Sequence, residues 1–371
     1  MKAPGTQSIS AGQLAILYVS FMVGSAIINV PNPIIHLAGN MAWLSITVSA
    51  LLGMPLLSLV LYLFRCNPDD KYAAWLNRAY GRWIAGVLIA LQILLMTILL
   101  SNIVLDIGRF FTNTMMVETP IYIFNAITII VAMYTVHAGI EVMGRTFFLL
   151  LGSMLLAVVV IVFLAVPFTR VETLLPFFPE GMKPVLYGAY VSFGFPFAEL
   201  ILFAPILPFV RKENHQPVGK WMYVLTALAW FLQLVVTVIS ITTLGPLAGE
   251  RKFSLYAVAR LIEIGEFLRG LEAVVGIALI SGSFMKAAIV LFVLNDVTAH
   301  FFKLDDDKLL LPAIALVAYL LSMTMYHEEA EFVFSVQAVW PLLILAVGIV
   351  PLMLAALIMM VKRQAGEGQR K

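Results

Sequence analysis

The sequence predicts an all-α membrane protein with about ten transmembrane helices in a single domain, 1–371. Hydrophobic residues make up 62% of the 371 residues and charged residues only 12%. Soluble domains contain about 45–50% apolar and about 25% charged residues, and a soluble fold could not enclose so much apolar surface. Lipid must therefore surround most of this chain. The polar segments 1–12 and 362–371 are short, so we expect no additional soluble domain.

A helix that crosses the bilayer needs about 20 mainly apolar residues. The first apolar stretch is longer than the core of a signal peptide and lacks a convincing cleavage site, so we interpret it as a transmembrane helix. Ten such stretches follow one another, at 13–35, 41–64, 84–112, 120–138, 146–167, 185–210, 221–245, 271–300, 309–326 and 334–361.

The distribution of positive charge predicts the orientation of these helices. Cytoplasmic loops carry an excess of Lys and Arg, and here the loops on one side carry about twice as many as those on the other. The richer side includes both chain ends and the 65–82 loop. We therefore expect both termini to be cytoplasmic, which requires an even number of helices.

Two helices, the first and the sixth, contain residues that interrupt a helix. Gly lowers the cost of unwinding, and Pro removes a hydrogen-bond donor and collides with the preceding turn. Two ordinary kinked helices are the alternative, since Gly and Pro are common in membrane helices. Matching breaks favour an inverted five-plus-five repeat, 13–167 and 185–361, as in the LeuT fold. The residues are Gly24-Ser25-Ala26 before Pro31 and Pro33, and Phe193-Gly194-Phe195-Pro196 before Pro205 and Pro208.

The breaks predict a binding site, because unwound backbone at membrane depth persists where it lines a cavity or is buried in protein. We expect Gly24 and Gly194 to be required, since a Cβ would fill space that the ligand needs. Apolar walls favour a small neutral amino acid, with a sugar or nucleoside as the alternative. The expected ligand-binding residues are Gly24, Ser25, Ala26, Phe193, Gly194, Phe195, Phe197 and, on the facing eighth helix, Ser283.

Four charged residues lie within apolar stretches. A charge at the bilayer centre costs at least about 2.5–3.5 kcal/mol, so each should face a partner or water. Asp106 and Arg109 are three residues apart on one helix face, and we expect them to pair. Glu199 follows the second break by one turn and is expected to support that helix or to couple to a proton. Lys286 is expected to replace a coupling cation; alternatively, both side chains snorkel or cap broken helix ends.

The segment 250–272, on the predicted outer side, is amphipathic. Apolar residues recur in it at roughly helical spacing, with charged residues between them. We expect a short helix on the outer face, either as a packing element or as a lid over an outward vestibule. The apolar residues are Leu255, Val258, Ala259, Leu261, Ile262, Phe267 and Leu268, and the charged ones are Arg260, Glu263, Glu266 and Arg269.

Other classes of function find no support in the sequence. The single cysteine, Cys66, excludes an intramolecular disulfide, and the histidines are scattered without metal-ligand spacing. No Gly-rich phosphate loop and no basic tract for nucleic acid is present. We therefore expect no metal or other cofactor, no enzyme activity and no nucleic-acid binding.

Several of these residues together resemble the endospore germination permeases, which are the B subunits of spore germinant receptors. The resemblance extends over essentially the whole chain. It departs from the family pattern in the segment 268–272, which weakens any role for Glu272. The matching residues are Gln13 with Gly24-Ser25-Ala26 and Pro31; Gly194-x-Pro196-x-x-Glu199 with Pro205 and Pro208; Arg260 with Leu268-Arg269; and Lys286.

The resemblance implies the broken-helix fold of the amino acid–polyamine–organocation transporters and a location in the inner membrane of the endospore. It also implies an A-type subunit and a lipoprotein C-type subunit as partners, and a nutrient, commonly an amino acid, as ligand. We therefore expect a germinant-binding receptor subunit. The alternatives are a proton- or cation-coupled amino-acid transporter and an assembly scaffold whose pocket has decayed. The sequence predicts neither which nutrient binds nor whether any solute crosses.

Overall fold

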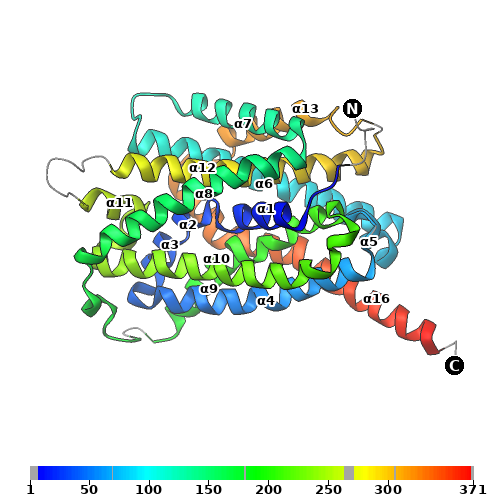
Figure 1. Ribbon diagram of the computed structural model, residues 1–371, viewed down its shortest axis with the longest axis horizontal. Helices are drawn as coiled ribbons and strands as arrows, with labels where there is room; N and C mark the ends of the chain where they lie inside the picture. Colours follow the sequence, from blue (N-terminus) through cyan, green and yellow to red (C-terminus); the bar gives the residue numbers. More distant parts are fainter. Residues whose placement is uncertain (1–6, 69, 179–180, 263–270, 305, 369–371) are drawn as a thin grey trace.

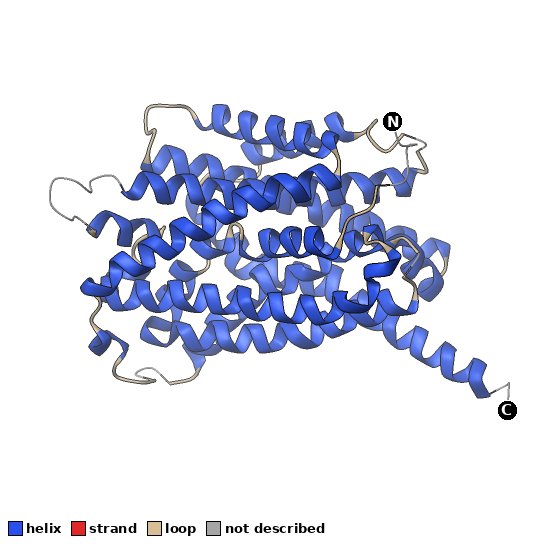
Figure 2. Ribbon diagram, viewed as in Figure 1, coloured by secondary structure: helices blue, strands red, loops and turns tan. Residues whose placement is uncertain are grey.

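The computed structural model describes residues 7–68, 70–178, 181–262, 271–304 and 306–368. Within these ranges the chain is almost wholly helical, and most loops lie at the two ends of the helix bundle (Figure 2). Nine spans in the described part are long and apolar enough to cross a membrane, and a tenth apolar helix is shorter. The prediction of about ten transmembrane helices is therefore confirmed.

The ten crossings follow the order of the chain, with a short helix α5 (Tyr72–Tyr80) after the second and α11 (Ser254–Leu261) after the seventh. They are α1 (Ala11–Val23) with α2 (Ala26–Asn29) and α3 (Pro31–Ala38); α4 (Ala42–Cys66); α6 (Arg82–Thr114); α7 (Ile121–Ala138); α8 (Ile140–Ala165); α9 (Lys183–Ser192) with η4 (Phe193–Phe197) and η5 (Ala198–Phe209); α10 (His215–Leu244); α12 (Leu271–Phe302); α13 (Leu311–Thr324); and α14 (Glu329–Phe334) with η8 (Ser335–Val339), α15 (Trp340–Leu343), η9 (Ile344–Ile349) and α16 (Val350–Gly368).

The two ends of the bundle differ in what they carry. Both termini lie at one end, beside α5, and α11 lies at the other (Figure 1). These are named the terminal end and the α11 end below. Two termini at the same end require an even number of crossings, as the charge distribution of the loops predicted.

The N-terminal segment is fixed to the end of the sixth crossing. The amide of Ile9 donates to the carbonyl oxygen of Phe209 at 2.9 Å, and the amide of Arg211 donates to the oxygen of Ile9 at 3.1 Å. The Ile9 side chain is fully buried. Ser10 and Gln13 then cap the start of α1 reciprocally, which satisfies two of its free amides. The terminal end is thus closed by backbone pairing between distant segments.

The first crossing is broken at Gly24. α1 ends at Val23, and Gly24 has φ −29° and ψ −87°, outside the helical region. A Cβ on Gly24 would lie 2.5 Å from the carbonyl oxygen of Gly282 on α12. Glycine at this position therefore permits the backbones of the first and eighth crossings to touch.

The sixth crossing is broken within η4. Phe195 has φ −145° and ψ 115°, which is extended backbone between two helical segments. Pro196 follows it and has no amide hydrogen to continue the helix. The two predicted breaks are therefore present at corresponding positions, which confirms the prediction of a LeuT-like fold with broken first and sixth helices.

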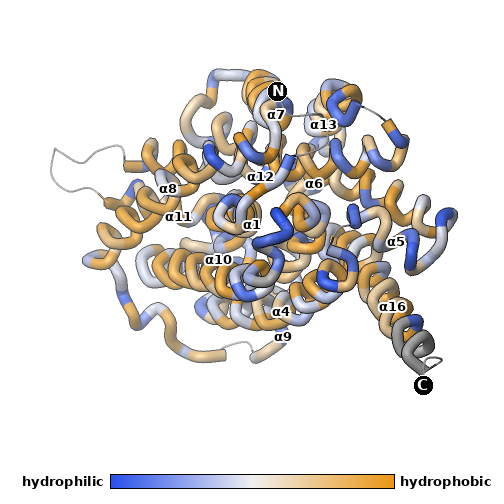
Figure 3. The backbone as a smooth tube through the Cα atoms, turned by 45° about the vertical axis from the view of Figure 1, so that its right-hand side comes forward, coloured by the Kyte–Doolittle hydropathy of each residue, from blue (hydrophilic) through white to orange (hydrophobic). Residues whose placement is uncertain are grey.

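The outer surface of the bundle is apolar. Trp83, Leu149 and Phe163 are 89%, 71% and 75% exposed, and apolar residues cover much of the helices (Figure 3). Such a surface is stable against lipid and unstable against water. Most of the buried polar residues lie in the interior, away from this apolar surface.

Candidate functional site

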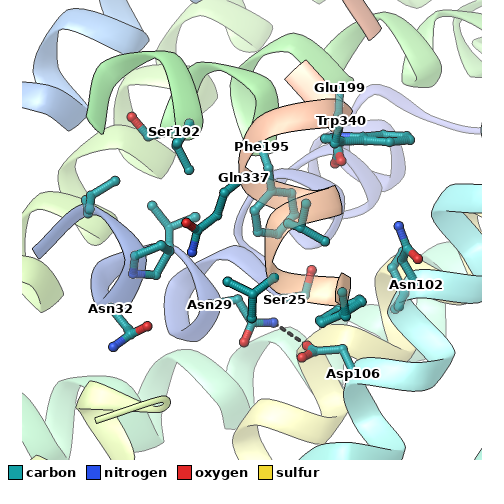
Figure 4. A pocket seen from close by; sticks show the side chains of 18 of the residues that line it. Ser25, Asn29, Asn32, Asn102, Asp106, Ser192, Phe195, Glu199, Gln337 and Trp340 are labelled. Atoms are coloured by element: carbon teal, nitrogen blue, oxygen red, sulfur yellow. Dashed lines mark hydrogen bonds between the residues drawn. The ribbon is translucent and has the colours of Figure 1, made fainter. Parts of the chain in front are cut away.

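A cavity of about 130 Å³ extends from the two breaks toward the α11 end (Figure 4). It lies where the first, third, sixth and tenth crossings meet. The lining is mainly apolar with several polar side chains, as in most small-molecule sites. The lining residues are Ser25, Asn29, Val30, Asn32, Pro33, Ile34, Leu99, Asn102, Ile103, Asp106, Val191, Ser192, Phe195, Glu199, Lys252, Phe332, Val333, Val336, Gln337 and Trp340.

Apart from Lys252 Nζ, which is ion-paired with Glu329, four polar atoms in this lining have no hydrogen-bond partner of regular geometry among the described residues. They are Ser25 Oγ, Asn102 Oδ1, Glu199 Oε1 and Trp340 Nε1. Each side chain is at most 8% exposed. Leaving a buried donor or acceptor without a partner costs about 1–3 kcal/mol. Four such atoms around one cavity make it the candidate binding site of the described chain.

An ion pair between Glu199 and Lys286 lies directly between the two breaks. The ammonium of Lys286 donates to Glu199 Oε2, and the two side chains are 0% and 1% exposed. The same ammonium lies over the rings of Phe195, at 4.1 Å from its centroid, and Phe21, at 5.2 Å. The prediction that these buried charges face a partner is confirmed. The pair ties the sixth crossing to the eighth and leaves Glu199 Oε1 for the cavity.

The third crossing contributes a second polar group. The side-chain amide of Asn29, on α2, donates to Asp106 Oδ2 on α6. Asn102 lies one turn before Asp106 on the same face. Asn32 extends the polar row toward the α11 end, where its amide donates to the carbonyl oxygens of Gly249 and Arg251.

Asp106 and Arg109 interact electrostatically, but they form no direct ion pair, so the predicted pairing is only partly confirmed. Asp106 takes its hydrogen bond from Asn29, while the guanidinium of Arg109 lies 4.8 Å from the centroid of the Phe332 ring. Spacing along one helix places the two on a common face, but their direct contacts are with residues of the first and tenth crossings.

The predicted ligand-binding residues divide into two groups. Ser25 and Phe195 line the cavity, and so does Glu199. Most of the others occupy helix contacts next to it. Ser283 lines a second, much smaller cavity of about 10 Å³, which it shares with Asn29 and Asp106. The residues outside the main lining are Gly24, Ala26, Phe193, Gly194, Phe197, Ser283 and Lys286.

The reason we gave for the two glycines is wrong. A Cβ on Gly24 would meet the backbone of Gly282, and a Cβ on Gly194 would meet the ring of Pro341. Neither would project into the cavity. These glycines permit close helix contacts rather than leaving space for a ligand. Phe197, likewise, packs against α4 at Gly53.

The amphipathic segment forms the expected short helix, α11, but its role as a lid gains no support. Leu255, Val258 and Ala259 are buried against the bundle, whereas Leu261 is 50% exposed. Positions 263–270 lie outside the described residues. The α11 end of the cavity is lined by Lys252, just before α11, which forms a 2.5 Å ion pair with Glu329 at the start of α14.

The sequence analysis missed Asn102 and Trp340 and assigned Asn29 no role. A signal was available: Ser25 and Asn29, and likewise Asn102 and Asp106, are polar pairs four residues apart in otherwise apolar helices. That spacing places each pair on one helix face, and polar groups within a membrane helix face the protein interior.

The comparison with known families identifies the chain. Residues 8–332 match the profile of the spore permeases, described as "Spore germination protein". The chain belongs to this family. Spore germination protein KB of Bacillus subtilis (strain 168) is 27% identical over 327 residues, covering 87% of this chain and 86% of the relative. Spore germination protein XB of Bacillus anthracis is 23% identical over 289 residues, covering 77% and 79%.

Solved transporters share the fold of this spore germination family member. MhsT in complex with L-phenylalanine superimposes with a TM-score of 0.71 at 12% identity, covering 95% of this chain and 99% of that one. A manganese transporter of Eremococcus coleocola gives 0.68 at 14% identity, covering 95% and 83%. A nucleobase-cation-symport-1 family transporter with bound bromovinylhydantoin gives 0.66 at 12%, covering 91% and 75%. At these identities the likeness shows the fold alone.

Family and fold together indicate a multi-pass, permease-like integral membrane protein. Membership in the spore germination family implies the inner membrane of the spore. The family also relates the chain to germinant receptor complexes.

Proposed function

We propose that this chain is the nutrient-binding membrane subunit of a spore germinant receptor and that the cavity holds the nutrient. The observation that carries the proposal is the set of four unpartnered polar atoms, on Ser25, Asn102, Glu199 and Trp340, around an apolar cavity beside both breaks. A soluble nutrient would supply the missing partners, and the apolar walls would exclude water around it.

Ligand binding at this place would act on both broken helices. Ser25 follows the first break, and Phe195 lies within the second, so one molecule in the cavity touches both. One carboxylate oxygen of Glu199, Oε1, faces the cavity, and the other, Oε2, accepts the hydrogen bond from Lys286. A ligand that engages Oε1 therefore alters the ion pair between the sixth and eighth crossings. An A-type and a lipoprotein C-type subunit are the proposed recipients of that change.

A proton- or cation-coupled amino-acid transporter is the second candidate. The transporters that share the fold favour it. The two functions share the cavity and differ in whether the ligand crosses. Uptake of radiolabelled amino acids into proteoliposomes separates them: a receptor subunit binds without accumulating label, whereas a transporter accumulates it.

A cavity-filling variant tests the proposal directly. Val336 lines the cavity from the tenth crossing, away from the ion pair. Val336→Trp should abolish the thermal stabilisation of the purified full-length protein by nutrients and should raise the nutrient concentration that spores need to germinate. Val317→Trp places the same bulk on a lipid-facing part of α13, where Val317 is 49% exposed, and serves as the control.

The abundance of each variant in spore membranes is measured in parallel. If Val336→Trp accumulates normally and responds at wild-type concentrations, the nutrient does not bind in this cavity. The same result would favour the scaffold alternative, in which pocket substitutions leave nutrient sensitivity unchanged.

A further inference from the structure

Two polar pairs face one another across the cavity. Ser25 and Asn29 are four residues apart on the first crossing, where the backbone amide of Asn29 donates to the backbone carbonyl oxygen of Ser25 at 3.2 Å. Asn102 and Asp106 have the same spacing on α6. Both crossings run from the terminal end to the α11 end, so their residues follow a parallel register (Figure 1).

The hydrogen bond from Asn29 to Asp106 fixes that register. One turn back along each helix, about 6 Å nearer the terminal end, Ser25 and Asn102 both line the same cavity. The oxygens Ser25 Oγ and Asn102 Oδ1 both lack partners among the described residues, and their side chains are 2% and 8% exposed. Two buried oxygen atoms and a carboxylate, those of Ser25, Asn102 and Asp106, therefore line the same cavity (Figure 4).

Asp106 is the carboxylate of the cavity that forms no direct ion pair, although Lys252 and Arg109 are near enough to interact with it electrostatically. Glu199 is paired with Lys286, and Lys252 with Glu329. Arg109 lies over the Phe332 ring. In the described ranges of the chain, no Lys, Arg or His nitrogen comes within ion-pair distance of Asp106. Its hydrogen bond from Asn29 uses Oδ2. Oδ1 thus stays available to a ligand.

We propose that Asp106, Asn102 and Ser25 bind the protonated amine of the ligand. The inference rests on the proposed function, since it assigns one end of the molecule in the same cavity. An alkylammonium has three N–H donors and no acceptor. Asp106 Oδ1, Asn102 Oδ1 and Ser25 Oγ offer three acceptors, one of them charged. An amine-bearing nutrient fits this corner, and a sugar leaves the carboxylate unneutralised.

The orientation of the ligand follows from the same arrangement. The amine lies against the third crossing, away from the ion pair of Glu199 and Lys286. The rest of the molecule extends toward Phe195 and Trp340. In this arrangement α6 selects ligands that carry an amine, and the rest of the ligand contacts the break in the sixth crossing.

The test compares amines with matched compounds that lack the positive charge. Full-length protein in lipid nanodiscs is melted with each of the twenty L-amino acids, and dissociation constants are measured for those that stabilise it. Each active amino acid is paired with its 2-hydroxy acid, such as L-lactate for L-alanine, and D-glucose and KCl are included. The wild type should bind the hydroxy acid at least about tenfold more weakly, because a hydroxyl carries no charge to pair with Asp106.

Variants locate the effect. Asp106→Asn should weaken amino-acid binding at least about tenfold and should remove most of the preference over the hydroxy acid. Asp307→Asn makes the same change at an exposed position of the terminal end and should behave as the wild type. Asn102→Leu keeps the side-chain size and should weaken binding too, which keeps the test decisive should Asp106→Asn fail to accumulate.

The outcomes separate this inference from the proposed function. If Val336→Trp abolishes amino-acid binding while Asp106→Asn and Asn102→Leu bind as the wild type, the nutrient site stands and the amine assignment fails. Stabilisation by D-glucose alone, or by KCl alone in an Asp106-dependent manner, also overturns the assignment. Unaltered binding in Val336→Trp removes the nutrient site itself.

Discussion

Lys286 and Glu199 form an ion pair that is wholly buried between the two broken helices. The ammonium lies over the aromatic rings of Phe21 and Phe195, one from each broken crossing. A fixed positive charge thus holds together the first, sixth and eighth crossings.

Removal of one member of the pair should destabilise the protein strongly. Lys286→Met leaves Glu199 charged and unpaired in the interior, at a cost of about 3–5 kcal/mol. The double variant Lys286→Met with Glu199→Gln removes both charges and should recover most of the lost stability. Thermal melts of the purified variants measure this coupling. Equal melting temperatures for the single and double variants would show that the pair contributes no coupling.

We predict that function is independent of sodium, on the hypothesis that the ammonium of Lys286 replaces a coupling cation. Germination of wild-type spores in choline buffer should match that in sodium buffer. Lys286→Arg should rescue poorly, since a planar guanidinium is larger than the fully packed site. A strict sodium requirement in the wild type would rule out this role.

Substitution of Gly24 should reduce stability rather than ligand affinity. A methyl group on Gly24 meets the Gly282 carbonyl and forces α1 and α12 apart, so Gly24→Ala should lower the amount of folded protein. Gly152→Ala on α8 is the control, because nothing lies within 4 Å of a Cβ there. The control should be neutral or about 0.5–1 kcal/mol more stable. Normal abundance of Gly24→Ala with a shifted nutrient response would restore our earlier explanation of this glycine.

The ion pair of Lys252 and Glu329 should affect access more than stability. The two side chains are 29% and 49% exposed, and pairs of this kind contribute about 0–1 kcal/mol. Lys252→Ala should leave the melting temperature nearly unchanged while altering the rate and the salt dependence of the nutrient response. The exchange Lys252→Glu with Glu329→Lys should restore the rate and the salt dependence of the nutrient response. If it does not, the ion pair has no role in access to the cavity.

Topology is tested by cysteine labelling in a Cys66→Ala background. Asn77 is exposed on α5 at the terminal end, and Leu247 is 57% exposed at the α11 end. Asn77→Cys should react with a membrane-impermeant reagent only from the cytoplasmic side, and Leu247→Cys only from the other. The opposite pattern would invert the predicted orientation.

The sequence predicted what depends on local chemistry. Helix length follows from apolar runs, and the breaks follow from Gly24 and the Phe195–Pro196 pair, whose backbone preferences act within a few residues. The need of Glu199 and Lys286 for partners also followed, since a lone charge in a bilayer is too costly.

Contacts between distant segments could not be predicted in this way. Gly282 is the partner that Gly24 requires, and nothing near Gly24 in the chain indicates it. Asp106 binds Asn29 rather than its neighbour Arg109, because the rotation of α6 about its axis decides which faces meet. The cavity lining depends on these rotations, so seven of the predicted ligand-binding or coupling residues lie just outside it.

The pairing of Ile9 with the end of η5 has a consequence for the opening of the terminal end of the bundle. If a solute leaves the cavity through that end, the two backbone hydrogen bonds of Ile9 must break as it opens. The exchange rate of the Arg211 amide with deuterium would report that opening. A sensor keeps this amide protected for hours with or without nutrient, whereas a carrier exposes it once in every transport cycle.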